Sequence, residues 1–157
     1  MEKRPEWRTA FRTAVFVHGA IVGSLFMYAV IFEVLKATVR PLPRLAAGTG
    51  VQPLRYVFYG LAIGAVIAVR LVGRNALKAP LSEPFREFLQ RLSRDAIFTS
   101  ILCEAPAVLG LMLVFLTGFS RDFYYLLFVS LFLAFMYFPR SRTWIEIIRE
   151  RFPQEGV

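Results

Sequence analysis

Long apolar runs separated by short charged segments dominate this sequence. Residues 96–120 form a stretch of 25 residues in which Glu104 is the only charged side chain. A helix of this length crosses the hydrocarbon core of a bilayer, which is about 30 Å thick. Three further runs have the same character, although the last of them is short. The pattern predicts four transmembrane helices, at about residues 13–35, 54–73, 96–117 and 123–138.

Two segments outside these runs have the spacing of amphipathic helices. In the connection 75–95, the apolar residues Phe85, Phe88, Leu89 and Leu92 fall at helical intervals. This part is either a basic helix that lies on the membrane surface or a plain extension of the third span. The tail 139–157 repeats the pattern with Trp144, Ile145, Ile148 and Phe152. The expected fold is an all-α integral membrane protein, a single membrane domain over residues 1–157 with short basic amphipathic cytoplasmic helices.

Charge distribution gives the expected orientation. The chain is 57% apolar and carries a net charge of +8, yet its Lys and Arg residues alternate from one connection to the next. Fourteen of the 19 lie in the N-terminus, the connection 75–95 with its flanks, and the tail. Positively charged loops stay in the cytoplasm. We therefore expect both termini to be cytoplasmic in the cell (inner) membrane, with anionic lipid head groups as partners and no nucleic acid.

The residue inventory argues against several functional classes. Cys103 is the single cysteine, which excludes an intramolecular disulfide, and His18 is the single histidine. One histidine makes a histidine-based metal site improbable and cannot supply paired axial ligands for a haem. The sequence has no Ser-His-Asp set and no phosphate-binding glycine loop. We expect no enzyme, no cofactor and no metal.

Glu104 is the strongest candidate for a functional residue. A carboxyl group inside a span is costly in its charged form and is a candidate for taking up and releasing a proton. Pro106 has no N–H, so the Leu102 carbonyl loses its helical donor and could help to hold a proton or cation, with Ser100 one turn away. Two alternatives remain: a neutral Glu104 that only hydrogen-bonds across a helix interface, and a contact with lipid or a partner.

Two residues could approach Glu104. His18 and Glu104 enter their spans from the same side, at depths that differ by about one helical turn. Arg70 is either a counter-ion for Glu104 or an arginine that extends to the membrane interface. Separately, Gly19 with Gly23 and Gly60 with Gly64 have the spacing that lets helices approach closely. These pairs predict close packing of the first two helices.

The central hairpin, about residues 56–117, resembles subunit c, the proteolipid of rotary ATP synthases. The likeness lies in a glycine-containing first helix (60–77), a polar loop with Glu83-Pro84, and the motif Glu104-Ala-Pro-Ala-Val-Leu-Gly-Leu111. It implies an ion-binding carboxylate at Glu104. The sequence departs from the family where Val66, Ala68 and Arg70 replace ring-packing glycines.

These observations lead to two functional expectations. The first is a small multi-pass subunit of an oligomeric or multi-protein membrane complex, proteolipid-like, which binds a proton or cation at Glu104. The second is a scaffold subunit that transports nothing and holds a larger membrane complex together. Under both functions we expect the chain to contact other membrane subunits or further copies of itself.

Overall fold

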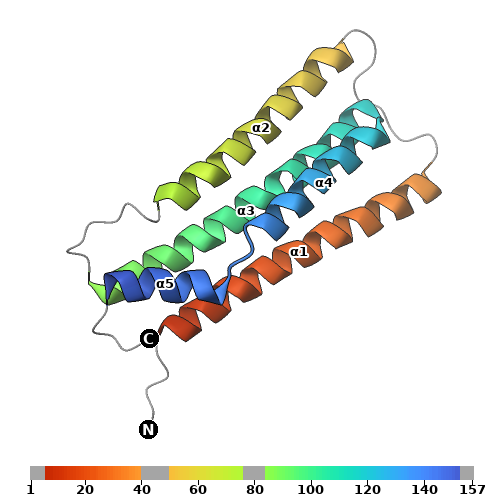
Figure 1. The fold of residues 1–157 in the computed structure, drawn as a ribbon. Coiled ribbons are helices and arrows are strands. Elements are labelled where there is room, and N and C mark those ends of the chain that lie inside the picture. Colours follow the sequence, from red (N-terminus) through yellow and green to blue (C-terminus); the bar gives the residue numbers. More distant parts are fainter. Residues whose placement is uncertain (1–5, 40–49, 76–83, 153–157) are drawn as a thin grey trace.

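The protein folds as a bundle of helices that run up and down along one axis. The computed structural model describes residues 6–39, 50–75 and 84–152. Within them the helices are α1 (Glu6–Thr38), α2 (Val51–Asn75), α3 (Phe85–Thr117), α4 (Ser120–Met136) and α5 (Ser141–Arg151), and no strand is formed in these ranges. The starts of α1 and α3 and the whole of α5 lie at the same end of the bundle (Figure 1). The all-α prediction is confirmed.

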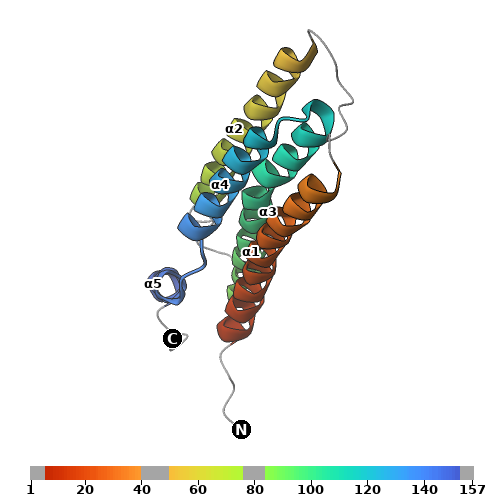
Figure 2. The ribbon, with the colours of Figure 1, turned by 90° about the vertical axis from the view of Figure 1, so that its right-hand side faces the viewer.

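Helix α3 is the centre of the bundle. It packs against α1, α2 and α4, and α1 also packs against α4 (Figures 1 and 2). Side chains from all four of these helices form the main core, which includes Leu25, Phe32, Val69, Cys103, Val114, Phe123 and Leu133. The buried Cys103 belongs to this core, in agreement with a packing role.

Three helices, α1, α2 and α3, are long and apolar enough to cross a membrane. Helix α4 has only 17 residues and meets this criterion only together with α5, from which it is bent by 48°. The bend follows from Pro139, because proline cannot donate the next helical hydrogen bond. Helix α4 ends at Met136, two residues before the predicted end of the fourth span.

The connection 75–95 does not form a separate surface helix. Helix α3 begins at Phe85 and continues without a break into the third apolar run, so the extension is the correct alternative and the separate basic helix is wrong. The reason is that its apolar face is buried by protein: Phe88, Leu89 and Leu92 form a second core with Trp7 and Ala14 of α1. Residues 76–83 of this connection lie outside the described ranges.

The tail does form an amphipathic helix, as predicted, but it packs on the bundle. Trp144 and Ile148 of α5 are buried in the second core. The ring centroids of Phe11 of α1 and Trp144 are 5.5 Å apart. The Phe152 ring lies against those of Phe85 and Phe88. Figure 2 shows α5 nearly end-on, across the direction of α4. The second core thus joins the starts of α1 and α3 to α5.

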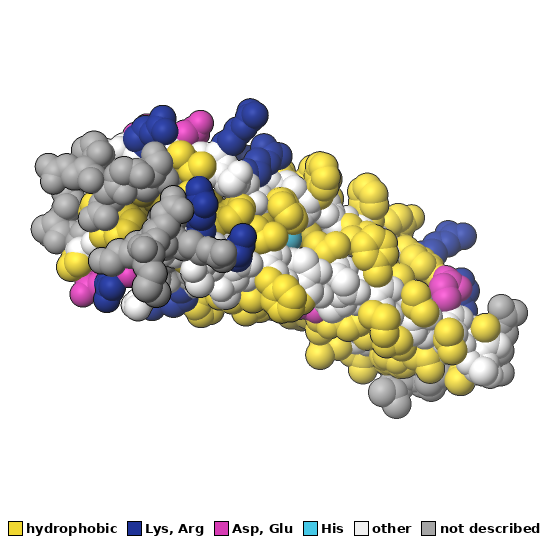
Figure 3. Space-filling view, turned by 90° about the horizontal axis from the view of Figure 1, so that it is seen from below, with side chains coloured by type: hydrophobic (Ala, Val, Ile, Leu, Met, Phe, Trp, Pro, Cys, Tyr) yellow, Lys and Arg dark blue, Asp and Glu magenta, His cyan; other side chains and the backbone are white. Residues whose placement is uncertain are grey.

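Apolar side chains also cover much of the outer surface. Figure 3 shows hydrophobic side chains along the middle of the molecule and Lys and Arg side chains gathered towards its ends. On α4 the exposed residues include Tyr125, Phe128, Phe132 and Phe135, the last with 80% of its surface exposed. An uncovered apolar surface of this extent is typical of a chain that contacts lipid or other apolar helices.

The predicted packing of α1 on α2 through paired glycines is wrong within this chain. A Cβ built at Gly19, Gly23, Gly60 or Gly64 would meet no neighbouring atom within 4 Å. Helix α2 packs on α3 instead, so these glycines face outward. The close approach occurs at Gly110, where a Cβ would lie 2.9 Å from Leu126 Cβ and 3.3 Å from Phe123 Cα.

We expect Gly110→Ala to destabilise the bundle. The added methyl group would collide with Leu126 Cβ and crowd the Phe123 backbone of α4. Overpacking costs about 1–3 kcal/mol, against a gain of up to about 1 kcal/mol in helix propensity. Thermal unfolding in detergent should show a lower melting temperature for Gly110→Ala. The control is Gly60→Ala, which adds the same group in open space and should be neutral or stabilising. Equal melting temperatures for the two variants would contradict close α3–α4 packing at Gly110.

Candidate functional site: the polar interface of α1 and α3

Glu104 lies where α3 faces α1, and two hydroxyl groups of α1 bind the same carboxyl oxygen. Ser24 Oγ and Tyr28 OH each donate to Glu104 Oε1 over 2.6 Å. Ser24 and Tyr28 are four residues apart, so both side chains project from one face of α1. Glu104 is half-buried. The carboxyl group is therefore held by hydrogen bonds across a helix interface.

Ser24 has two acceptors within reach but only one hydroxyl hydrogen. Its Oγ lies 2.7 Å from the Ile21 carbonyl oxygen and 2.6 Å from Glu104 Oε1. When Glu104 is ionised, Ser24 can donate to the carboxylate. When Glu104 is protonated, its O–H can donate to Ser24, which then donates to the Ile21 carbonyl. Both protonation states of Glu104 thus have hydrogen-bond partners in the same arrangement of atoms.

His18 is fully buried and lies six residues before Ser24 on α1. Its Nε2 lies 2.8 Å from the Ala134 carbonyl oxygen of α4, so this nitrogen must carry the hydrogen and donate. Its Nδ1 lies 2.7 Å from Ser100 Oγ of α3, and Ser100 Oγ also lies 2.9 Å from the Ala96 carbonyl oxygen. His18 therefore connects α1 with both α3 and α4.

The contact between His18 and Glu104 that the sequence allows is not formed. His18 bonds to Ser100 and Ala134, and the hydrogen bonds of Glu104 go to Ser24 and Tyr28. Ser100, whose hydroxyl group was expected to contribute to a site at Glu104, hydrogen-bonds with His18 instead. Arg70 is exposed on α2 and makes no ion pair with Glu104 in the described part of the chain. Arg70 is therefore not a counter-ion for Glu104. It is an exposed arginine on the surface of α2.

Pro106 lies inside α3, where it has no N–H to donate to the Leu102 carbonyl. The adjacent amide, Ala107 N–H, donates to Ser130 Oγ of α4 over 2.8 Å. Side chains of neighbouring helices commonly satisfy backbone groups that a proline displaces. The Leu102 side chain packs on the main core. An ion-holding role for the Leu102 carbonyl stays a prediction.

No family model, curated protein or solved structure matches this chain. The resemblance to the proteolipid family therefore stays a prediction. Helices α2 and α3 are neighbours, as a hairpin requires. The hydroxyl groups that donate to Glu104, however, belong to α1, which lies outside the hairpin that resembles the proteolipid. Among the described residues, no group of three or more His, Cys, Asp or Glu could hold a metal ion.

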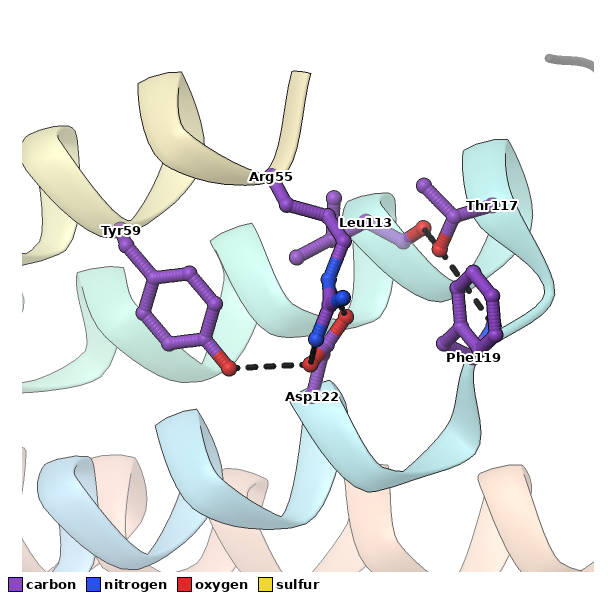
Figure 4. Close-up of polar contacts among 6 residues, drawn as sticks. All are labelled: Arg55, Tyr59, Leu113, Thr117, Phe119 and Asp122. Atoms are coloured by element: carbon purple, nitrogen blue, oxygen red, sulfur yellow. Dashed lines mark hydrogen bonds and ion pairs between the residues drawn. The ribbon is translucent and has the colours of Figure 1, made fainter. Parts of the chain in front are cut away.

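A second polar cluster fastens the opposite end of the bundle. Arg55 of α2 binds Asp122 of α4 with two hydrogen bonds, Nε to Oδ2 at 2.8 Å and Nη2 to Oδ1 at 2.7 Å (Figure 4). Tyr59 OH donates to the same carboxylate over 3.0 Å. The Asp122 side chain is 1% exposed and that of Arg55 29%. The Arg55 guanidinium also lies over the Phe119 ring, 5.3 Å from its centroid.

Near the same end, α1 is joined to α4. Lys36 Nζ lies 3.5 Å from Glu33 Oε1, one helical turn earlier on α1. Tyr124 of α4 donates its hydroxyl hydrogen to Glu33, and Lys36 Nζ lies 3.3 Å from the Tyr124 oxygen. With Arg55 and Asp122, these contacts tie both α1 and α2 to the start of α4.

Sequence reasoning missed four residues that form these sites: Ser24, Tyr28, Asp122 and Tyr59. Ser24 and Tyr28 are polar residues at i and i+4 within the first apolar run, which is the signal that could have found them. Asp122 is the only acidic residue in the predicted turn between the third and fourth spans. A buried acid there needs a cation, and Arg55 is an arginine expected at the same end.

Proposed function

We propose that the protein is a multi-pass membrane subunit that binds a proton at Glu104, in the interface of α1 and α3. In this proposal α1, α2, α3 and the shorter α4 are the four spans. Three of these helices have the length and apolarity to cross a membrane. The exposed apolar side chains along the middle of the molecule support the same placement (Figure 3).

The proposed orientation places the end with α5 in the cytoplasm. This end carries five described arginines near the beginnings of helices: Arg8 and Arg12 of α1, Arg86 and Arg94 of α3, and Arg142 of α5 (Figure 1). The opposite end has fewer basic residues among those described: Lys36, Arg55 and Arg121. Since an excess of Lys and Arg marks the cytoplasmic side, both termini are cytoplasmic, and the cell (inner) membrane is the proposed location.

The observation that carries the proposal is the pair of acceptors around the Ser24 hydroxyl group. Its hydrogen can point to Glu104 Oε1 at 2.6 Å or to the Ile21 carbonyl at 2.7 Å. A proton can therefore arrive at Glu104 or leave it while the Ser24 hydroxyl group keeps a hydrogen-bond acceptor in both states. Unpaired polar groups in an apolar medium cost several kcal/mol, about 4–8 in the extreme case, so this arrangement keeps both states accessible.

The donor set favours a proton over a metal cation. Ser24 and Tyr28 direct hydroxyl hydrogens to Glu104, whereas a cation would need their oxygen lone pairs directed at itself. Hard cations in proteins are also surrounded by about six or more oxygen ligands. Three side-chain oxygens that are already hydrogen-bonded to one another fit a proton better.

The test is modification of the native protein by dicyclohexylcarbodiimide, an apolar reagent that adds to neutral carboxyl groups. We expect a stable adduct on Glu104 in membranes, located by peptide mass spectrometry, and less adduct as the pH rises. Glu33, which is exposed at the end of α1, serves as an internal control and should retain little label. Absence of label on Glu104 at every pH would contradict proton binding. Protection of Glu104 by Na⁺ would replace the proton with a cation.

A scaffold subunit remains the second candidate, and the same contacts favour it. The bonds of Glu104 tie α1 to α3, and those of His18 tie α1 to α3 and α4. The exposed aromatic face of α4 could then contact another membrane subunit or a second copy of the chain. A scaffold would be indifferent to Glu104→Gln and would purify with a constant set of partners.

A further inference from the structure

A groove lies between α1 and α3 at the end of the bundle where both helices begin. Its volume is about 810 Å³. Helix α1 lines it with Glu6, Thr9 and Thr13, and α3 lines it from Arg86 to Ile101. The groove lies apart from Glu104, Ser24 and Tyr28, none of which lines it. It is therefore a separate feature of the same helix pair.

The lining changes from polar to apolar along α3. Arg86, Gln90, Ser93 and Arg94 come first, and Ile97, Phe98 and Ile101 follow. The change coincides with the start of the third apolar run at residue 96, where the bilayer core is expected to begin. Phe98 and Ile101 are exposed to the surroundings. A polar head above an apolar body is the order of groups in a membrane phospholipid.

The polar part of the groove carries a positive charge. Arg86 is neutralised by Glu6, whose Oε1 lies 2.6 Å from Arg86 Nη2. Arg94 is exposed and has no ion pair among the residues that the structure describes. Gln90 and Ser93 add neutral donors next to it. A guanidinium group with nearby hydroxyl and amide donors is suited to a phosphate group.

The geometry points to a binding site for one anionic phospholipid in this groove. Arg94 binds the phosphate of the head group, Gln90 and Ser93 add hydrogen bonds, and an acyl chain lies along Ile97, Phe98 and Ile101. The inference depends on the proposed placement in a membrane, and it is independent of proton binding at Glu104. The lipid fills the open side of the α1–α3 pair, at the level of the second core.

The test is native mass spectrometry of the full chain, extracted from membranes in a neutral detergent. The probes are phosphatidylglycerol and phosphatidylcholine with identical acyl chains. Arg94→Gln removes the charge in the groove. The matched control is Arg12→Gln, since Arg12 is also an exposed arginine, lies near the start of α1 and does not line the groove. Thr9→Trp fills the groove without removing a charge.

We expect the native chain to bind phosphatidylglycerol about tenfold more tightly than phosphatidylcholine. Arg94→Gln should raise the Kd for phosphatidylglycerol about fivefold, since one basic residue near an anionic surface contributes about that factor. Arg12→Gln should change it less than twofold, and Thr9→Trp should weaken both lipids. Equal effects of the two arginine changes, or no preference of the native chain, would overturn the inference. Release of the chain from membranes by alkaline carbonate, without detergent, would instead overturn the proposed function.

Discussion

Glu104→Gln is expected to leave the bundle folded while removing its proton site. The glutamine carbonyl can accept the hydrogen bonds of Ser24 and Tyr28, and its shape is that of the neutral acid. The proton cannot be released from an amide. Infrared spectra of the native protein should contain the carbonyl band of a neutral carboxyl group that disappears at high pH. In Glu104→Gln this pH-dependent band should be absent, with an unchanged melting temperature.

Glu104→Leu separates the structural contribution of Glu104 from its proton. Leucine leaves the hydroxyl groups of Ser24 and Tyr28 without their shared acceptor. Hydrogen bonds between membrane helices contribute about 0.6 kcal/mol each on average and about 1.7 kcal/mol at most in double-mutant cycles. We expect a destabilisation of about 1–3 kcal/mol for the loss of two such bonds. The melting temperature in detergent would report it.

A pH-dependent carboxyl band that survives in Glu104→Gln would assign the band to another acid and remove the support for proton binding.

Asp122→Ala is expected to have the largest effect on stability. Asp122 is buried, and its removal leaves the Arg55 guanidinium and the Tyr59 hydroxyl without their acceptor. Breaking one partner of a buried ion pair costs about 3–5 kcal/mol, and the partial exposure of Arg55 places the expected cost at about 3 kcal/mol. The melting temperature in detergent should fall by roughly 5–10 °C. Amide hydrogen exchange in the first turns of α2 should accelerate, because Arg55 and Tyr59 no longer hold α2 to α4.

Two variants make this expectation specific. Arg121→Gln changes the charge of the neighbouring, exposed residue and should be close to neutral. Arg55→Met combined with Asp122→Leu replaces both ions by apolar groups and should recover much of the loss, because no buried charge is left unpaired. If Asp122→Ala were as stable as Arg121→Gln, the ion pair would contribute nothing to holding α2 in place.

The boundaries of most helices follow from local features of the sequence. The run 96–117 is helical because its apolar residues are nearly continuous. Helix α3 ends at Thr117, just before Gly118, whose φ of 75° suits glycine. Pro139 separates α4 from α5 in the same local way. The start of α3 was ambiguous, since a surface helix and an extended span have the same spacing of Phe85, Phe88 and Leu89. Only the neighbouring Trp7 and Trp144 decide between them.

The partners of the polar side chains came from the tertiary structure alone. The sequence by itself determined that Glu104 and His18 lie within apolar runs, because position along a run is a local property. Which residues face them depends on how each helix is rotated about its axis. Lipid tails are about as apolar as leucine, so a helix that is apolar all round gives no sign of its buried face. For this reason the sequence predicts the wrong neighbour for the glycine pairs, and only the packing of α1 beside α3 makes Ser24 and Tyr28 the partners of Glu104.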